Sequence, residues 1–140
     1  MPELPEAETI ARQLRNRIVG RRVTAVQVVR GDVVRQGGKL VAGLRGRTIA
    51  GVRRIGKAVL LEFSGSRCLL FRLGMTGTLT VDQGGRLAQH AHLALLLGRH
   101  LRLQFVDARR FGGVYAHSAS SLSKAAEVCR LGVDPLSPAF

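Results

Sequence analysis

Cysteine, acidic residues, lysine and long apolar runs are all scarce in this chain of 140 residues. Its two cysteines, Cys68 and Cys129, are too far apart in sequence to form a CxxC pair, so they cannot assemble a zinc site. No apolar run approaches the ~20 residues that span a bilayer. Residues 2–9 are acidic, whereas a secretion signal begins basic and then turns apolar. We therefore expect a cytoplasmic protein with reduced cysteines and no membrane-spanning segment.

The shortage of acids gives the chain its strongest chemical character. Nine Asp and Glu residues stand against 22 Lys and Arg residues, for a formal net charge of +13. Such a surplus on a small domain favours a polyanion as the partner. A genome rich in arginine codons is a second explanation, because only three of the basic residues are lysines, but it does not account for the missing acids. We therefore expect nucleic acid as the partner.

Apolar residues, by contrast, are plentiful at 46% of the chain, which is enough for a folded core. Residues 3–19 predict one amphipathic helix, because their apolar side chains recur at steps of three and four. That stripe consists of Leu4, Ala7, Ile10, Ala11, Leu14 and Ile18. Pro5 suits the first turn of this helix, and Gly20 suits its end.

Short β-like runs, separated by breaks rich in glycine, serine and aspartate, follow this helix. Many short strands with tight turns predict a mainly β protein, an antiparallel sandwich of about eight strands with a leading helix. The expected strands are 22–29, 47–55, 57–63, 67–73, 76–81, 91–97, 100–106 and 112–116. We expect a loop with a short helix at 31–46, another short helix at 120–132, and an extended linker with two prolines at 133–140. Residues 1–132 would then form one domain.

Proline at position 2 has a chemical and a structural interpretation. Removal of Met1 would leave Pro2 with a free secondary amine, whose pKa near ~8 keeps a useful fraction neutral and nucleophilic at pH 7. Its attack on a sugar aldehyde carbon gives an iminium ion, which favours β-elimination of a phosphate, and Glu3 could carry the protons. The structural alternative is that Pro and Glu simply favour the start of a helix. If Met1 is retained, the Pro2 nitrogen is an amide and cannot react.

Four motifs occur in register along the chain and together carry a resemblance. The chain resembles the formamidopyrimidine-DNA glycosylase family, bacterial enzymes that repair oxidised purines. The motifs are MPELPEAETI at the N-terminus, then RIGKAVLLEF, LGMTGTL and DARRFGG. The resemblance implies excision of 8-oxoguanine or formamidopyrimidine from damaged double-stranded DNA, followed by strand nicking through β/δ-elimination.

The resemblance also implies the catalytic residues. Pro2 would be the nucleophile at C1′ and form the Schiff base, while Glu3 would donate and accept protons. Glu6 matches a further acid of the opening motif. Lys57 would be the lysine assigned to proton transfer and a phosphate contact; the alternative is an ordinary surface lysine.

Three further residues match those that fill the gap left by the extruded nucleotide: Met75, Arg109 and Phe111. Extrusion costs a few kcal/mol of lost stacking, so an enzyme must replace the lost contacts with its own side chains. A thioether and an aromatic wedge restore apolar contact, and Arg109 can donate to the orphaned cytosine. Met75 and Phe111 could instead belong to the core, and Arg109 with Arg110 could bind phosphate.

His90 aligns with the family's histidine that contacts the DNA backbone. A metal site is the alternative, because His90 and His92 would share one face of a strand and His100 is near in sequence. No acid or cysteine lies close in sequence to complete a ligand set, so we expect no metal here. Arg53 and Arg54 would extend the phosphate-binding surface beside Lys57.

The chain departs from the family pattern in two ways. HAHLA replaces the common HDHVD, which removes two acids, and DARRFG replaces DPRRFG. Family members also continue beyond this linker into a helix–two-turn–helix domain and a Cys₄ zinc finger, so we expect no cofactor in this chain. We expect a bacterial, nucleoid-associated monomer whose isolated activity is weak or absent. A non-catalytic basic module that binds nucleic acid, and more distantly a ribosomal-type RNA-binding protein, remain the alternatives.

Overall fold

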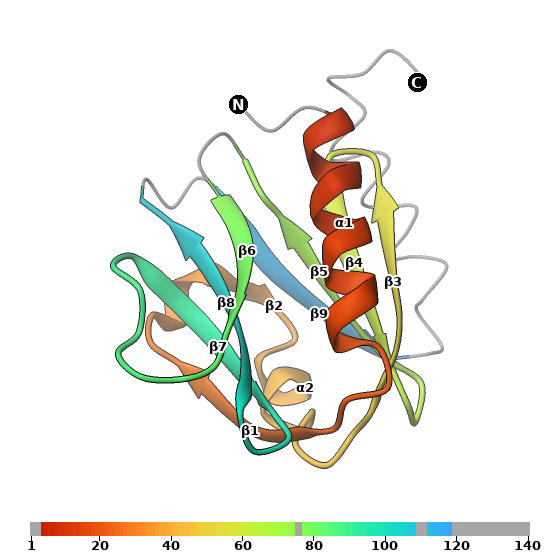
Figure 1. The fold of residues 1–140 in the computed structure, drawn as a ribbon, viewed down its shortest axis with the longest axis vertical. Coiled ribbons are helices and arrows are strands. Elements are labelled where there is room, and N and C mark those ends of the chain that lie inside the picture. Colours follow the sequence, from red (N-terminus) through yellow and green to blue (C-terminus); the bar gives the residue numbers. More distant parts are fainter. Residues whose placement is uncertain (1–3, 75–76, 109–111, 119–140) are drawn as a thin grey trace.

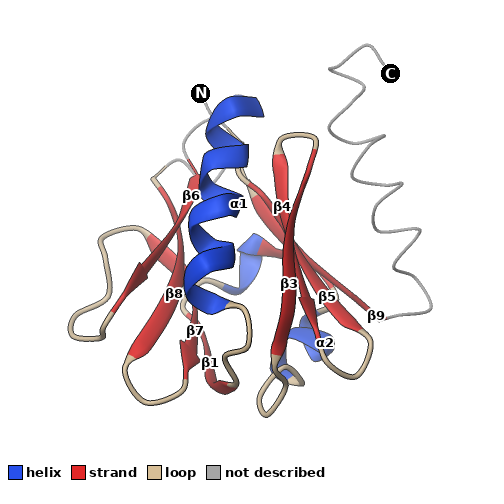
Figure 2. Ribbon diagram, turned by 45° about the vertical axis from the view of Figure 1, so that its right-hand side comes forward, coloured by secondary structure: helices blue, strands red, loops and turns tan. Residues whose placement is uncertain are grey.

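Two facing β-sheets and one long helix form the molecule (Figures 1 and 2). The computed structural model describes residues 4–74, 77–108 and 112–118. The predicted helix at 120–132 and the linker at 133–140 lie outside these residues. Helix α1 (Leu4–Ile18) comes first and lies at the open edge between the two sheets, as Figure 2 shows.

The first sheet has four antiparallel strands in the order β1-β7-β8-β6. They are β1 (Val23–Val28), β7 (Ala91–Leu97), β8 (Leu101–Asp107) and β6 (Gly77–Asp82). The second sheet has five strands in the order β2-β9-β5-β4-β3. They are β2 (Val34–Gln36), β9 (Gly113–Ser118), β5 (Arg67–Arg72), β4 (Ala58–Phe63) and β3 (Ile49–Ile55). All eight predicted strands and the leading helix are therefore confirmed.

A ninth strand within the described residues, β2, was missed by the sequence prediction. The stretch 31–46 holds a 3₁₀ turn (Gly31–Val33), β2 and the short helix α2 (Gly38–Ala42), of which only the helix was expected. The three residues of β2 are too few to show an alternating pattern, and they pair in parallel with β9. Gly37 lies between β2 and α2 with φ 79°. A Cβ atom there would lie 2.3 Å from the carbonyl oxygen of Ala116, so the position requires glycine.

The apolar stripe of α1 packs into the gap between the sheets. Ala11, Leu14 and Ile18 are buried, and Ile10 is half-buried beside them. The helix packs mainly against β3, where the Arg15 side chain donates to the carbonyl oxygen of Val52 at 3.1 Å. In the described part of the chain, no helix is long and apolar enough to cross a membrane.

Side chains from both sheets meet in one central core. Phe71 of β5 and Phe105 of β8 approach to 5.6 Å between ring centroids, at a tilt of 52°. Such tilted aromatic pairs stabilise the contact beyond the area they bury. The core fixes the two sheets against each other, so the turns at the end of the sandwich keep defined positions.

Candidate active site

The β3–β4 hairpin presents Lys57 at its tip. Ile55 pairs with Ala58, so only Gly56 and Lys57 form the turn. Gly56 has φ 60°, a left-handed conformation that glycine adopts without steric cost. The Lys57 side chain is half-buried. A short, regular turn therefore holds this lysine at one end of the sandwich.

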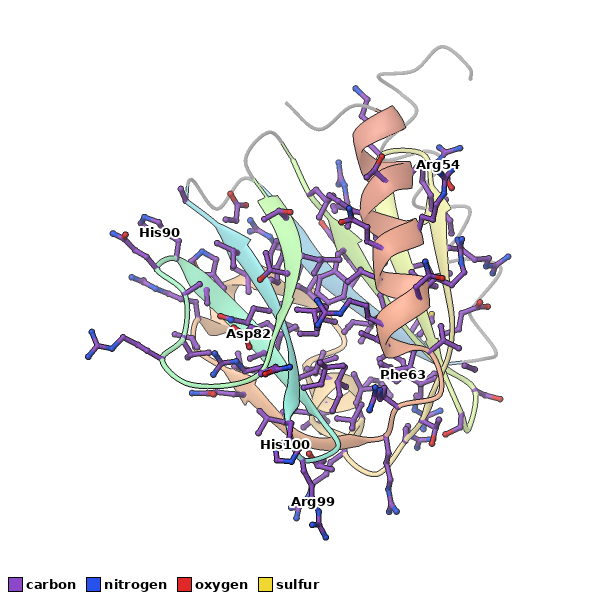
Figure 3. The ribbon with its side chains drawn as sticks, in the orientation of Figure 1. Arg54, Phe63, Asp82, His90, Arg99 and His100 are labelled. Carbon is purple, nitrogen blue, oxygen red and sulfur yellow. The ribbon has the colours of Figure 1, made fainter. Side chains whose placement is uncertain are left out.

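An ion pair ties the first half of α1 to this hairpin. Arg54 Nε lies 3.1 Å from Glu8 Oε1, and Arg54 Nη1 donates to the carbonyl oxygen of Gly56 at 3.0 Å. Figure 3 labels Arg54 beside the upper half of the helix. Glu8 also lies 3.6 Å from Arg12, one turn along the helix. The segment that follows Pro2 and Glu3 is thus fastened beside Lys57.

We expect this ion pair to stabilise the fold only slightly, because both side chains remain about one-third exposed. In a double-mutant cycle of Glu8→Gln and Arg54→Gln, the coupling free energy should be about 0.5 kcal/mol and should fall as salt is added. Urea unfolding measures it. The Glu62–Arg53 pair, also at 3.1 Å but with Arg53 55% exposed, is the matched control and should give a smaller value. A coupling energy of zero at low salt would contradict the proposed attachment.

Asp107 closes the connection between β8 and β9. Its side chain is fully buried, and its Oδ2 accepts a hydrogen bond from the backbone N–H of Gly112 at 2.9 Å. The Asp107 N–H donates to the carbonyl oxygen of His90 at 3.0 Å. A Cβ at Gly112 would lie 2.2 Å from the carbonyl oxygen of Arg72, so this position requires glycine. The first residue of the DARRFGG motif, Asp107, and the first of its two glycines, Gly112, are therefore fixed in place.

The three central histidines do not gather. His90 precedes β7 with φ 65° and is exposed, whereas His92 is buried, with Nε2 2.7 Å from the carbonyl oxygen of Asp107. His100 lies at the opposite end of the molecule (Figure 3). The expectation that His90 and His92 share a strand face is wrong, because His90 ends a turn and β7 begins only at Ala91. Among the described residues, no three His, Cys, Asp or Glu side chains are grouped to hold a metal ion.

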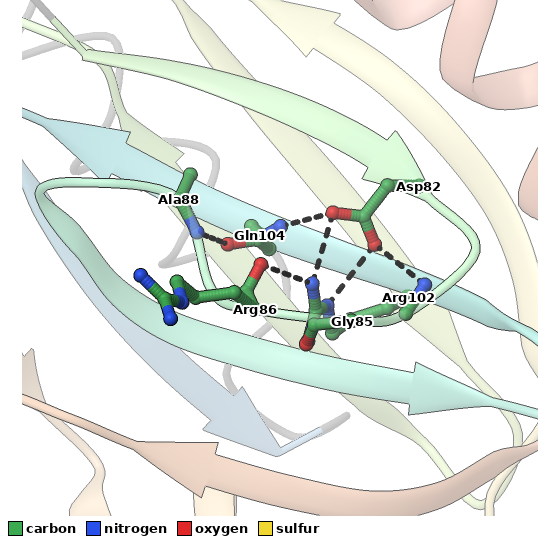
Figure 4. A network of polar contacts seen from close by, with 7 residues as sticks. Asp82, Gly85, Arg86, Ala88, Arg102 and Gln104 are labelled. Carbon is green, nitrogen blue, oxygen red and sulfur yellow. Dashed lines mark hydrogen bonds and ion pairs between the residues drawn. The ribbon is translucent and has the colours of Figure 1, made fainter.

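A polar network lies on the outer face of the first sheet (Figure 4). Arg102 donates to both carboxylate oxygens of Asp82 at 3.0 Å, and the side-chain amide of Gln104 donates to Asp82 as well. Burial alone would raise the pKa of the Asp82 carboxyl. The hydrogen bonds from Arg102, the Gly84 N–H and Gln104 outweigh burial, and the pKa lies below its usual value.

The same network fixes the loop that leads to His90. Arg102 Nη1 donates to the carbonyl oxygen of Gly85 at 2.9 Å. The Gln104 side-chain oxygen accepts from the Ala88 N–H, also at 2.9 Å. Two rigid strand positions thus hold the loop before His90, although the loop itself contains no regular structure.

With this geometry established, comparison with known proteins shows the family. The model of the formamidopyrimidine-DNA glycosylase N-terminal domain matches residues 1–114. The chain belongs to this family. A formamidopyrimidine-DNA glycosylase of Moorella thermoacetica is 38% identical over 143 residues, which cover 100% of this chain and 52% of the relative. One of Corynebacterium jeikeium is 41% identical over 115 residues, covering 80% and 40%.

Solved glycosylase structures match the fold as well. The Lactococcus lactis Fpg (MutM) in complex with FAPY-dG-containing DNA superimposes with a TM-score of 0.82 at 29% identity, covering 88% of this chain and 47% of that one. Its complex with DNA containing an abasic site gives a TM-score of 0.81. The chain spans about half the length of the curated relatives it matches.

The start of α1 and the Lys57 hairpin lie at one end of this domain (Figure 1). The end of β5, the start of β6, the end of β8 and the start of β9 lie at the same end. The predicted residues Pro2, Glu3, Met75, Arg109, Arg110 and Phe111, and the side chain of Glu6, lie outside the described residues. The backbone that flanks each of them is nevertheless brought to this end.

Sequence reasoning missed the residues that support the site. Glu8 looked like an ordinary residue of a helix N-terminus, and its partner Arg54 was assigned to phosphate. Roles were predicted for the arginines of the DARRFGG motif but not for Asp107. An aspartate at the end of a strand often accepts hydrogen bonds from the backbone of the following loop, and this was the available signal. Asp82 begins an Asp-x-Gly turn, in which the Gly84 N–H donates to Asp82 at 3.2 Å. Arg102 and Gln104 gave no signal, because they alternate along β8 like any polar strand residues.

Proposed function

We propose that this chain is the N-terminal catalytic part of a bifunctional DNA glycosylase and AP lyase that excises oxidised purines. Residues 1–132 would form the catalytic domain, and 133–140 would begin the linker to a second DNA-binding domain. The observation that carries the proposal is the fastening of the helix that follows Pro2 to the Lys57 hairpin, through the 3.1 Å Glu8–Arg54 pair. Helix and hairpin lie at the end where the strands that flank the other motifs also end or begin.

In the proposed reaction, the neutral amine of Pro2 attacks C1′ of the damaged nucleotide. The bond from C1′ to the base breaks, and the base leaves with a proton from Glu3. The sugar ring opens to an iminium ion on the Pro2 nitrogen. Loss of a proton from C2′ then expels the 3′ phosphate, and a second elimination expels the 5′ phosphate. Lys57, on its short turn, would assist proton transfer and contact a phosphate.

The remaining predicted residues would bind the damaged duplex. Met75, Arg109 and Phe111 would fill the gap left by the extruded nucleotide. His90, Arg110 and Arg54 would contact phosphates, although Arg54 would then be shared between phosphate and Glu8. Base selection would depend largely on the second domain, so we propose that the isolated chain acts weakly.

Borohydride trapping on abasic DNA tests the chemistry. With the chain in excess over an abasic duplex, we expect an adduct whose mass equals the chain without Met1 plus the abasic strand less one oxygen atom, because iminium formation releases water and borohydride adds two hydrogens. Glu3→Gln should slow release of an oxidised purine by on the order of 100-fold, since a proton donor is lost. Lys57→Ala should slow strand nicking, whereas the control Lys39→Ala, an exposed lysine of α2, should not.

Two outcomes would overturn this proposal. An adduct that survives Pro2→Gly but not Lys57→Ala would move the nucleophile to the lysine. Failure to trap at any protein concentration, with DNA binding retained, would leave a non-catalytic basic module. Turnover of damaged duplex at the rate of a two-domain enzyme would instead contradict the expected weakness of the isolated chain.

A further inference from the structure

A second basic surface lies at the end of the sandwich away from the Lys57 hairpin. It combines the α1–β1 connection, the loop before β3 and the β7–β8 turn. Figure 3 shows Arg99 and His100 at this end, far from Arg54. We call it the distal basic face; its exposed members are Arg21, Arg22, Arg45, Arg99 and His100.

Backbone hydrogen bonds join these three segments. The Gly98 N–H donates to the carbonyl oxygen of Arg22 at 2.9 Å, and the Gly46 N–H donates to that of Val23 at 2.7 Å. The Thr24 hydroxyl donates to the carbonyl oxygen of Gly98 at 2.9 Å. Each arginine of the face therefore stands on, or next to, a backbone position that the fold fixes.

A shallow cavity of about 290 Å³ lies within this face. It is lined by Arg22, Val23, Thr24, Arg45 and Gly46. The two arginines flank this concave surface, and they are its donors for an anion because the Thr24 hydroxyl already donates to backbone carbonyl oxygens. This shape suits one phosphate group with its oxygens turned toward guanidinium donors.

Among the described residues, no acid forms an ion pair with this face. The segments that form it, residues 19–24, 43–48 and 98–100, contain no Asp or Glu. Three of the acids in the described ranges bind arginines elsewhere, as Glu8 does with Arg54, Glu62 with Arg53 and Asp82 with Arg102.

Within the described residues, the guanidinium groups of this face also have no hydrogen-bonding partner. Those of Arg22, Arg45 and Arg99 form no ion pair or hydrogen bond with any part of the chain that the structure describes. By contrast, Arg47 and Arg67 at the same end donate to backbone carbonyl oxygens. The donors of the distal basic face therefore remain available for an external anion.

We propose that the distal basic face binds the phosphate backbone of a second segment of duplex DNA, distinct from the segment bound at the Lys57 end. Arginine forks match phosphate oxygens in pairs, and the face offers no groove-reading element, so binding should be independent of sequence. One chain would then hold two duplexes at once. This inference does not depend on the proposed chemistry at Pro2.

A bridging assay tests it. Two duplexes of about 20 base pairs, one carrying a donor dye and the other an acceptor, are mixed with the 140-residue chain at low salt. Energy transfer should appear in a complex that contains one chain, as its sedimentation mass shows. Arg45→Gln with Arg99→Gln should weaken bridging about tenfold or more and lower the salt slope of the second binding step by about 2.

The matched control removes the same charge from other exposed positions, through Lys39→Gln with Arg86→Gln, and should keep bridging within about twofold. Circular dichroism verifies that both variants fold. Equal loss in both variants would reduce the effect to net charge and overturn the proposal, as would bridging that persists in the Arg45/Arg99 variant. Preferential displacement of the second duplex by an RNA duplex would assign the face to RNA. The Arg45/Arg99 variant should still trap abasic DNA like the unaltered chain, which separates this proposal from the catalytic one.

Discussion

A single extra residue on the amino side of Pro2 is expected to abolish covalent trapping of abasic DNA. In that variant the Pro2 nitrogen is part of an amide: its lone pair is delocalised, and it already bonds three carbon atoms, so it cannot form the iminium ion. We expect the adduct to fall by at least about 100-fold, since no other group in the proposed mechanism supplies a nucleophile. The rest of the chain is unchanged, so its fold and its affinity for undamaged DNA should remain.

The extension can carry a protease site that ends directly before Pro2, which makes the experiment its own control. Trapping is measured on one preparation before and after cleavage, with intact mass as the measure of the exposed amine. The adduct should rise in proportion to the cleaved fraction. Trapping that is already complete before cleavage would place the nucleophile elsewhere, and Lys57 would be the first residue to test.

The leading helix and eight strands could be predicted because their patterns are local. In α1 the residues at steps of three and four, such as Ala11 and Ile18, are those that the core buries. Strand β2 could not be predicted, since its place is set by parallel pairing with β9, about 80 residues further along the chain. Local pattern identifies an element, but only tertiary contacts show where a three-residue strand pairs.

In the candidate site too, some residues could be predicted from local sequence and others only from tertiary contacts. Lys57 was identified by its motif, and the hairpin that presents it follows from a two-residue turn with glycine. The attachment between Glu8 and Arg54 joins residues 46 positions apart, and no sequence spacing indicates it. A motif therefore predicts candidate reactive residues, whereas the residues that support them can be found only from distances in the structure.

The departure from HDHVD to HAHLA also has a structural explanation. Ala91 is 6% exposed and Ala94 is fully buried, so carboxylates at these positions would need partners inside the sheet. With alanine at both, β7 needs no buried charge compensation. His92 between them stays buried against the edge of Phe105, at 6.4 Å between ring centroids. The two alanines therefore avoid placing two carboxylates in the interior.

Replacing Asp107 with alanine should have the largest effect on stability. The change removes the acceptor of the buried Gly112 N–H and leaves a small cavity at the end of β8. We expect the free energy of unfolding to fall by about 2 to 3 kcal/mol, measured by urea unfolding. Asp107→Asn keeps a side-chain oxygen as acceptor and should cost less than half as much. Gln83→Ala, at an exposed loop position, is the control and should change stability by no more than about 0.5 kcal/mol.

If Asp107 also positions the β8–β9 connection, its replacement should alter base recognition as well as stability. Gly112 follows the segment that contains Arg109 and Phe111, so loss of the Gly112 hydrogen bond should release one end of that loop. In Asp107→Ala, kept at a temperature at which circular dichroism shows the native fold, trapping on a bare abasic site should stay near the level of the unaltered chain. Preference for cytosine opposite the lesion should decline, because the donor proposed to read that base is no longer held in place. An unchanged preference for cytosine would show that Asp107 contributes to folding only, and that its hydrogen bond to the β8–β9 connection does not affect recognition.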